Sequence, residues 1–272
     1  MVINYHRTLV VHGRLAMKES RLEAARNKEH GLQVMTFEQV ATRLAGGFFR
    51  PIDRESLRSA IQAGLSKTPM GELENIKLLP GMIEAVADTF HKAWLAGINL
   101  AVLSANHPRI AALVLLEESV LDQLPAGMMR PFDIVAVATS RIAHAPAILG
   151  SLEIAGHTEL SPCWRTLLLA LANHIPVHWI ASPKEVPMWI NGTGVKVVRS
   201  LALKPNISSI SAATAYHEAI EAMRWVRDLL VSGVPASDIA IAAASTSDYD
   251  DYFLALRSDA SIDLHFVHGI RT

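Results

Sequence analysis

The chain opens with two short apolar runs that alternate with two helix-forming segments. Residues 8–12 (TLVVH) and 32–36 (LQVMT) have the composition of buried strands. Residues 14–30 and 37–45 are rich in Ala, Leu, Glu and Arg, and a glycine follows each of them. The order strand, helix, strand, helix is typical of a parallel sheet whose connections are helices. The first 47 residues therefore predict an α/β fold.

A long stretch of helical pattern interrupts this alternation. Residues 53–147 carry helix-forming sequence almost throughout, and Asp53 is placed to cap the first helix. The segment 133–138 (DIVAVA) could form a strand, but its alanine content and the residues after it favour a helix. We therefore expect a helical insertion at residues 48–149.

The strand and helix alternation returns after the insertion. A helix pattern at 161–173 separates two strand patterns, at 152–155 and 177–181. Together with the opening segment these elements predict one parallel sheet. We therefore expect a single parallel-sheet domain made of residues 1–47 and 150–233.

The last third of the chain carries further patterns of both kinds. Thr214 is placed to cap a helix that extends to Ser232, whose apolar positions step by three and four residues. Strands are predicted at 195–199, 208–213, 239–244 and 264–267, and a further helix at 245–259. The chain stops at Thr272, soon after the last predicted strand. We therefore expect a longer protein in which 234–272 begins a second α/β domain; a short natural protein is the alternative.

Positive and negative charges almost balance, with 25 Lys and Arg against 26 Asp and Glu. That balance excludes a strongly basic nucleic-acid clamp but leaves room for a local basic face. Cys163 is the only cysteine, which excludes an intramolecular disulfide and a Cys-rich zinc site. No apolar run approaches the ~20 residues of a membrane span, and the opening residues do not form a secretory signal. We expect a cytoplasmic protein without a membrane partner.

The first predicted strand ends at Gly13, where a nucleotide-binding protein would carry its phosphate loop. Such a loop has the form Gly-x4-Gly-Lys-Ser/Thr, because its backbone N–H groups wrap the phosphates and its lysine reaches them. Arg14 follows Gly13 directly, and no Gly-Lys pair occurs in the chain. A Gly-x-Gly-x-x-Gly dinucleotide loop and a Gly-x-Ser-x-Gly nucleophile elbow are absent too.

The chain also lacks residues that two further kinds of catalytic site require. His157, Glu159 and Cys163 match parts of the zinc deaminase signature, but that site needs a second cysteine. A PD-(D/E)XK nuclease needs a carboxylate two residues before a lysine, and no lysine of this chain has one. We therefore expect no catalytic residues, no metal site and no cofactor in this segment.

Several segments share their order and spacing with a helicase-related family. These segments are RLEAAR at 21–26 with GLQVMTFEQVATRLA at 31–45, LEIAGHTELS at 152–161, YHEA at 216–219 leading to IAIA at 239–242, and LHFVHG at 264–269. Together they resemble the N-terminal, helicase-like region of AddB-type proteins, the nuclease-bearing subunits of bacterial double-strand-break repair complexes. The resemblance covers most of the chain except about 53–148. It implies a RecA-like sheet domain followed by the start of a second one.

The resemblance also implies that the ATPase site has been lost. In an active helicase the Walker B strand ends in Asp-Glu, and the matching positions here are Ala155 and Gly156. Glu159 falls where helicases often carry a further acidic residue. Gly13 marks the position of the missing phosphate loop, and 242–244 (AAA) stand where an arginine is expected. Three separate parts of an ATPase site are therefore absent.

By this resemblance, the chain is an inactivated helicase-like scaffold in DNA break repair. It would bind DNA, a partner helicase–nuclease subunit, or both, while a PD-(D/E)XK nuclease further along the full protein cuts the DNA. The candidate residues for contacting DNA phosphates are Arg14, Arg43 and Arg50, from a set that also includes Arg7 and Arg21. A solvated helix face is the alternative interpretation of each.

Two other classes of function stay open. A small-molecule α/β enzyme would place its site at the carboxyl ends of the strands, around Gly13, Gly156 and Ser182, in a polar and convergent pocket. A plain protein-interaction domain would instead expose a large apolar patch. The sequence alone does not choose between these classes and the scaffold.

Overall fold

The computed structural model describes residues 6–181, 186–199 and 206–269, and the chain divides into two compact units, 1–202 and 203–272. The first unit holds a five-stranded sheet. Its strands are β1 (Arg7–Val10), β2 (Leu32–Met35), β5 (Ser151–Ala155), β6 (Val177–Ala181) and β7 (Lys196–Arg199). Their order is β2-β1-β5-β6-β7, and every neighbouring pair is parallel. The predicted α/β fold with a parallel sheet is confirmed.

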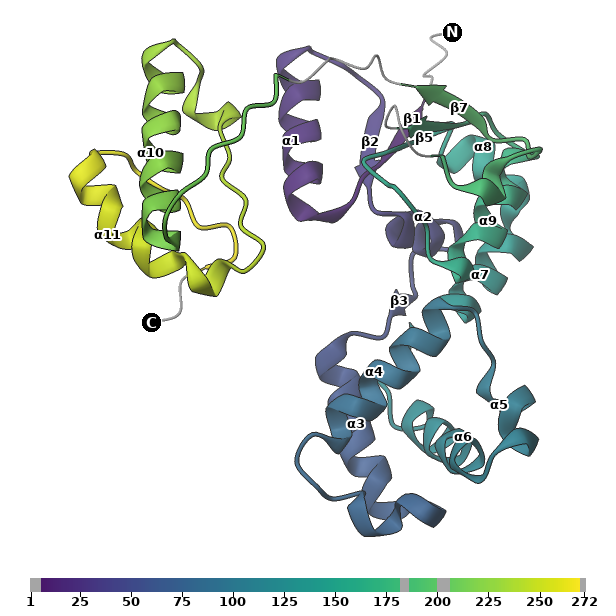
Figure 1. The fold of residues 1–272 in the computed structure, drawn as a ribbon. Coiled ribbons are helices and arrows are strands. Elements are labelled where there is room, and N and C mark those ends of the chain that lie inside the picture. The colour runs from purple at the N-terminus through teal and green to yellow at the C-terminus, as the bar shows by residue number, and fades with distance from the viewer. Residues whose placement is uncertain (1–5, 182–185, 200–205, 270–272) are drawn as a thin grey trace, which may run out of the picture. The chain divides into compact units, whose positions relative to one another are not determined.

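Helices cover the two faces of this sheet unequally. Helix α1 (Gly13–Arg26) joins β1 to β2, whereas α9 (Pro162–Ala172) joins β5 to β6 in the opposite direction across the sheet. Because such crossovers are right-handed, the two helices must lie on opposite faces. Figure 1 shows α1 on one side of the sheet and α7, α8 and α9 on the other.

The face that packs on α9 contains the main hydrophobic core. Side chains alternate along each strand, so Val10, Leu152, Ile154 and Trp179 all point to this face and are fully buried. Helices α2 (Phe37–Leu44), α7 (Pro131–Ser140), α8 (Ala145–Ile148) and α9 cover them, with η3 (Ile142–His144) between α7 and α8. The segment 133–138 is helical, as its alanine content predicts.

Two contacts fix the central pair of strands. The buried Thr8 hydroxyl donates a hydrogen bond to the Leu149 carbonyl oxygen over 2.8 Å, so its polar group is satisfied. Gly150 has φ +66° just before β5, and a Cβ there would lie 1.7 Å from the His6 carbonyl oxygen. Only glycine therefore allows β5 to begin this close to β1.

The helical insertion has a separate core. It begins at β3 (Arg50–Pro51) and ends at β4 (Met128–Met129), and these two short strands pair in parallel. Between them lie α3 (Arg54–Lys67), η1 (Gly71–Ile76), α4 (Met82–Leu95), α5 (Leu100–Leu103), η2 (Ser104–Asn106) and α6 (Pro108–Leu121). The Asp53 carboxylate accepts a hydrogen bond from the Ser56 N–H over 2.8 Å, which confirms the predicted cap of α3.

The insertion is shorter than predicted, because α7 and α8 pack into the sheet core rather than into the insertion. A buried polar group connects the two cores. The Glu117 carboxylate accepts hydrogen bonds from Trp94 Nε1 over 2.6 Å and from Arg130 Nη1 over 3.1 Å. Arg130 also pairs with Asp133 in the first turn of α7. The insertion is thus held to the sheet domain by a partnered charge.

The second unit consists of two helices that pack on each other. They are α10 (Ala215–Val231) and α11 (Asp250–Ala260), with η5 (Ala236–Asp238) and η6 (Thr246–Asp248) between them. Thr214 caps α10 as predicted, and Ala219, Met223, Phe253 and Leu256 form the small core. The division at 202/203 assigns α10 to this unit, whereas the sequence had placed it in the first domain.

The strand predictions for 208–213, 239–244 and 264–267 are wrong, because the structure has no strand in these segments. A strand needs a neighbour that takes its backbone hydrogen bonds, and an apolar run alone does not supply one. In the first unit, a short 3-10 helix, η4 (Met188–Ile190), precedes β7. Within the described residues, no helix is both long enough and apolar enough to cross a membrane.

Candidate functional site

The chain reverses its path through the sheet between β1 and β5. From β1 it moves outward to β2, and from β5 it moves the other way to β6 and β7. In open α/β sheets, ligands bind at the carboxyl ends of the two strands that flank such a reversal. Here the residues at this position are His12 and Gly13 after β1, and Gly156 and His157 after β5.

A row of aromatic rings lies along these strand ends. The rings of His12 and His157 meet edge to face with their centroids 5.6 Å apart. The His157 ring is 6.4 Å from that of Trp179 in β6, and Trp179 is 5.8 Å from Trp189 in η4. Two strand ends, the middle of β6 and the short helix η4 therefore contribute to a single cluster of flat side chains.

The surroundings of His157 disfavour the charged form of its ring. Its burial, and then the nearby His12, lower its pKa below the ordinary value, although hydrogen bonds to the backbone of Val11 and Glu159 oppose this shift. Its Nε2 atom is buried and has no hydrogen-bond partner, and the same is true of Nε1 of the fully buried Trp179. Two adjacent members of the cluster thus carry unsatisfied polar atoms.

Glu159 is occupied by structural contacts. Its Oε1 atom accepts hydrogen bonds from Trp189 Nε1 over 2.6 Å and from the Leu160 N–H over 2.8 Å, and it lies 3.3 Å from Arg165 Nη2. Burial alone would raise the pKa of Glu159, but these bonds and the Arg165 charge together lower it. The carboxylate therefore fixes Trp189 and Arg165 in place.

The phosphate-loop position contains no loop. Gly13, with φ +81°, begins α1 at once, and His12 gives the helix no side-chain cap. Ala155 ends β5 and Gly156, with φ +70°, is exposed, so the two positions that were compared with Walker B carry no carboxylate. Space is open over both glycines, since a Cβ at Gly13 or Gly156 would meet no atom within 4 Å. Among the described residues, no three His, Cys, Asp or Glu side chains gather as metal ligands.

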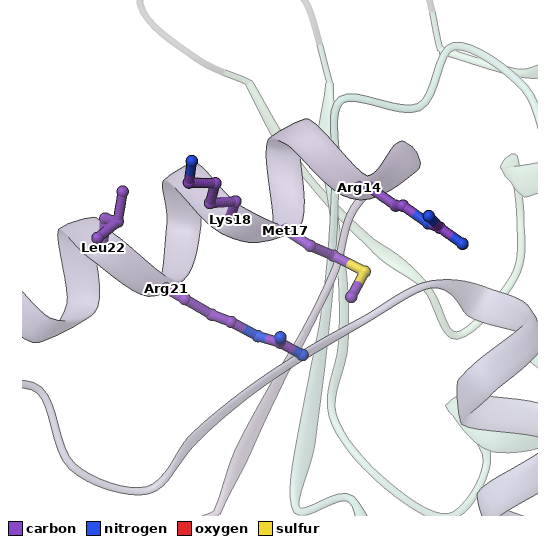
Figure 2. Close-up of a pocket in the computed structure, with 5 residues that line it drawn as sticks. All are labelled: Arg14, Met17, Lys18, Arg21 and Leu22. Carbon is purple, nitrogen blue, oxygen red and sulfur yellow. The ribbon is translucent and has the colours of Figure 1, made fainter.

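A second feature is the basic face of α1, which we define as Arg14, Lys18 and Arg21. At 100° per residue these three positions fall within an arc of about 60°. Together with Met17 and Leu22 they line a surface cavity of about 440 Å³. Figure 2 shows Arg14, Met17 and Arg21 pointing to one side of the helix, with Lys18 and Leu22 along its other rim.

The cations of this face lack acidic partners. Arg21 donates to the Val34 carbonyl oxygen of β2 over 3.0 Å, while Arg14 and Lys18 form no ion pair within the described part of the chain. The insertion differs, because Arg54 and Arg58 both pair with Glu84, at 2.8 and 2.6 Å. An unpaired cation keeps its charge available to an external anion.

The three predicted phosphate-contacting residues lie on three different elements. Arg14 lines the cavity on α1, Arg43 is exposed in the last turn of α2, and Arg50 is exposed in β3. Arg7 pairs with Glu29 and Glu153 and so has a structural role. Ser182 lies outside the described residues.

Sequence reasoning missed the aromatic cluster and the position of Lys18 beside Arg14 on α1. A signal was present for the cluster, since His12 and His157 each lie within two residues of a predicted strand end. Neither a known family model nor a curated protein matches the chain.

Proposed function

We propose that this chain is an inactivated helicase-like scaffold of DNA double-strand-break repair, which binds DNA through the basic face of α1 and does not hydrolyse ATP. A partner helicase–nuclease subunit and a cytoplasmic location belong to the same proposal. The observation that carries it is the unpaired charge of Arg14 and Lys18 on a helix that buries none of its residues.

The exposure of α1 supports DNA binding. Phosphate contacts need cations that reach solvent and are not already neutralised, and α1 offers two of these one helical turn apart. Its acidic residues, Glu19 and Glu23, fall on a different face by helical geometry. A strand of phosphates can therefore approach Arg14 and Lys18 without meeting a carboxylate of the same helix.

The strand ends support the loss of ATP hydrolysis. A phosphate loop would have to wrap a triphosphate between β1 and α1, but α1 begins at Gly13 without such a loop. The two acidic side chains near the proposed Walker B position already have partners: Glu159 contacts Trp189, Leu160 and Arg165, and Glu153 pairs with Arg7. We therefore expect no DNA-stimulated ATP hydrolysis.

The test is a fluorescence-anisotropy titration of DNA oligonucleotides, single-stranded and duplex, over a range of salt concentrations. The double variant Arg14→Gln/Lys18→Gln should bind more weakly and lower the magnitude of the salt slope of log K by about 1.8 with duplex and about 1.4 with single-stranded DNA, the values for two lost phosphate contacts. The matched control, Arg54→Gln/Arg58→Gln, removes the same charge from arginines that already pair with Glu84. It should leave the slope unchanged.

Two results would overturn the proposal. If both double variants change the salt slope equally, the binding reflects net charge rather than the basic face of α1. If single-stranded DNA stimulates ATP hydrolysis by the purified chain, the ATPase site is not lost.

A further inference from the structure

The first turns of α10 and α11 meet in the second unit and carry exposed aromatic rings. The Tyr216 ring of α10 lies 5.6 Å from the Tyr252 ring of α11, centroid to centroid, and 5.9 Å from the His217 ring. Tyr216 is 42% exposed and Tyr252 is 37% exposed, so both rings reach solvent. We call this surface, made of Tyr216, His217 and Tyr252, the tyrosine face.

The charge around the tyrosine face is negative. Residues 206–269, the described part of the unit, contain nine Asp and Glu against three Arg and no Lys. Each Arg lies about two turns or more beyond the first residue of its helix, at positions 224, 227 and 257. The carboxylates in or just before the first turns are those of Glu218, Asp248, Asp250 and Asp251.

Two of these carboxylates act on a third tyrosine at the same end of the unit. Glu218 Oε2 accepts a hydrogen bond from the Tyr249 hydroxyl over 2.7 Å. This bond, and then burial and the charges of Glu218 and Asp248, raise the pKa of Tyr249. Asp251 is exposed and precedes Tyr252 directly. The starts of both helices therefore present a negative potential beside exposed rings.

Such a surface selects its ligand by charge. The face of a tyrosine ring attracts a cation within about 6 Å of its centre, and an arginine guanidinium can also stack on the ring. Neighbouring carboxylates add to the attraction for a cation and repel an anion such as a DNA phosphate. Tyrosine is also among the residue types that carry most of the binding energy at protein interfaces. This combination fits a cationic segment of a protein.

We propose that the tyrosine face binds an arginine-rich segment of a partner protein. One guanidinium of the segment stacks on the exposed ring of Tyr216 or Tyr252, and other cations of the segment pair with Asp248 and Asp251. The inference goes beyond the proposed scaffold function, because it concerns a protein ligand and residues that take no part in the basic face of α1.

The test is fluorescence anisotropy of the full chain with labelled peptides of alternating Arg and Gly, Lys and Gly, or Glu and Gly. We expect the Arg peptide to bind more tightly than the Lys peptide and the Glu peptide not to bind. Tyr216→Leu/Tyr252→Leu should weaken binding of the Arg peptide about tenfold, the loss expected for two exposed cation–π contacts. Tyr216→Phe/Tyr252→Phe keeps both rings and should keep the affinity. The control Trp225→Leu, at an exposed aromatic residue elsewhere on α10, should keep it too.

A second pair of variants tests the carboxylates. Asp248→Asn/Asp251→Asn should weaken binding of the Arg peptide and flatten its dependence on salt. The matched control, Asp228→Asn/Asp259→Asn, removes the same charge from exposed positions in the last turns of α10 and α11 and should have a much smaller effect. Glu218 stays unchanged in both variants because it bonds to Tyr249.

Several results would overturn the proposal. They are no binding of the Arg peptide, equal affinity for the Arg and Lys peptides, equal affinity of the Leu and Phe double variants, and equal effects of the two Asn double variants. Self-association of the chain that depends on Tyr252 would assign the face to a second copy and would also overturn it. Arg14→Gln/Lys18→Gln should leave the peptide affinity unchanged, so the DNA proposal and this one can fail separately. Circular dichroism shows whether each variant keeps its helices.

Discussion

Helices α1 and α9 occupy equivalent positions in the chain yet are buried very differently. Helix α1 follows β1 and α9 follows β5, the two neighbouring strands at which the chain reverses, and each returns the chain to the next strand. Helix α9 buries five residues, Cys163, Trp164, Leu167, Leu168 and Leu171, whereas α1 buries none. One helix therefore supports the fold, and the other presents its surface to solvent.

The difference originates in the residues that face the sheet. Helix α1 has its partly covered positions at Ala16, Met17, Ser20 and Ala24, which are mostly small. Small side chains remove little apolar area from water, so this contact contributes little to stability. The surface of α1 is consequently free to carry charge.

The largest expected effect on stability comes from shortening a buried side chain of α9. Leu168 is fully buried, so Leu168→Ala should lower the free energy of unfolding by about 2–5 kcal/mol, from lost burial plus the cavity left behind. Urea denaturation followed by circular dichroism measures the change.

The matched change in α1 is Leu22→Ala. Leu22 is 47% exposed, so this substitution should alter the free energy of unfolding by no more than about 0.5 kcal/mol. Equal losses in the two variants would show that α1 is as deeply packed as α9, and the comparison would fail.

A second comparison concerns how readily a reagent reaches a thiol on each helix, the native Cys163 on α9 and a cysteine introduced on α1. Burial raises the pKa of the Cys163 thiol to about 12, so at pH 8 it is both protonated and covered. Its reaction with a disulfide reagent should be about two orders of magnitude slower than that of Leu22→Cys in a Cys163→Ala background. Similar rates would mean that α9 opens as readily as α1.

The smallest expected effect is the pH dependence of stability that comes from His157, in the loop between β5 and α9. The pKa of His157 in the folded chain lies below its value in the unfolded chain, so the unfolded state takes up protons first as pH falls. Stability should therefore decrease below about pH 6.5, the unperturbed value for histidine. His157→Phe should show a smaller decrease between pH 7 and pH 5 in the same denaturation assay. An identical pH dependence in both proteins would remove His157 as the cause.

The sequence predicted the sheet domain well because its strands are short apolar runs bounded by glycine or by helix caps. Strands β1, β2, β5, β6 and β7 all fall within one or two residues of the expected ranges. The run IAIAAA at 239–244 has the same composition yet forms no strand, since composition does not specify a pairing partner.

The candidate sites were predicted less completely, for a related reason. Arg14 could be chosen from sequence, but whether a cation is paired depends on residues distant in the chain, as Arg54 and Glu84 show. His12 and His157 are 145 positions apart, and only the parallel pairing of β1 with β5 brings them together. Contacts of that kind need the sheet order, which periodicity alone does not supply.

The most direct test of the scaffold account is amide hydrogen exchange, measured for α1 and α9 with and without single-stranded or duplex DNA. The account predicts that DNA slows exchange in α1 and leaves exchange in α9 unchanged, because α1 carries the unpaired cations Arg14 and Lys18 on an unburied face whereas the cation of α9, Arg165, pairs with Glu159. If α1 exchanges at the same rate with saturating DNA as without it, the account is contradicted.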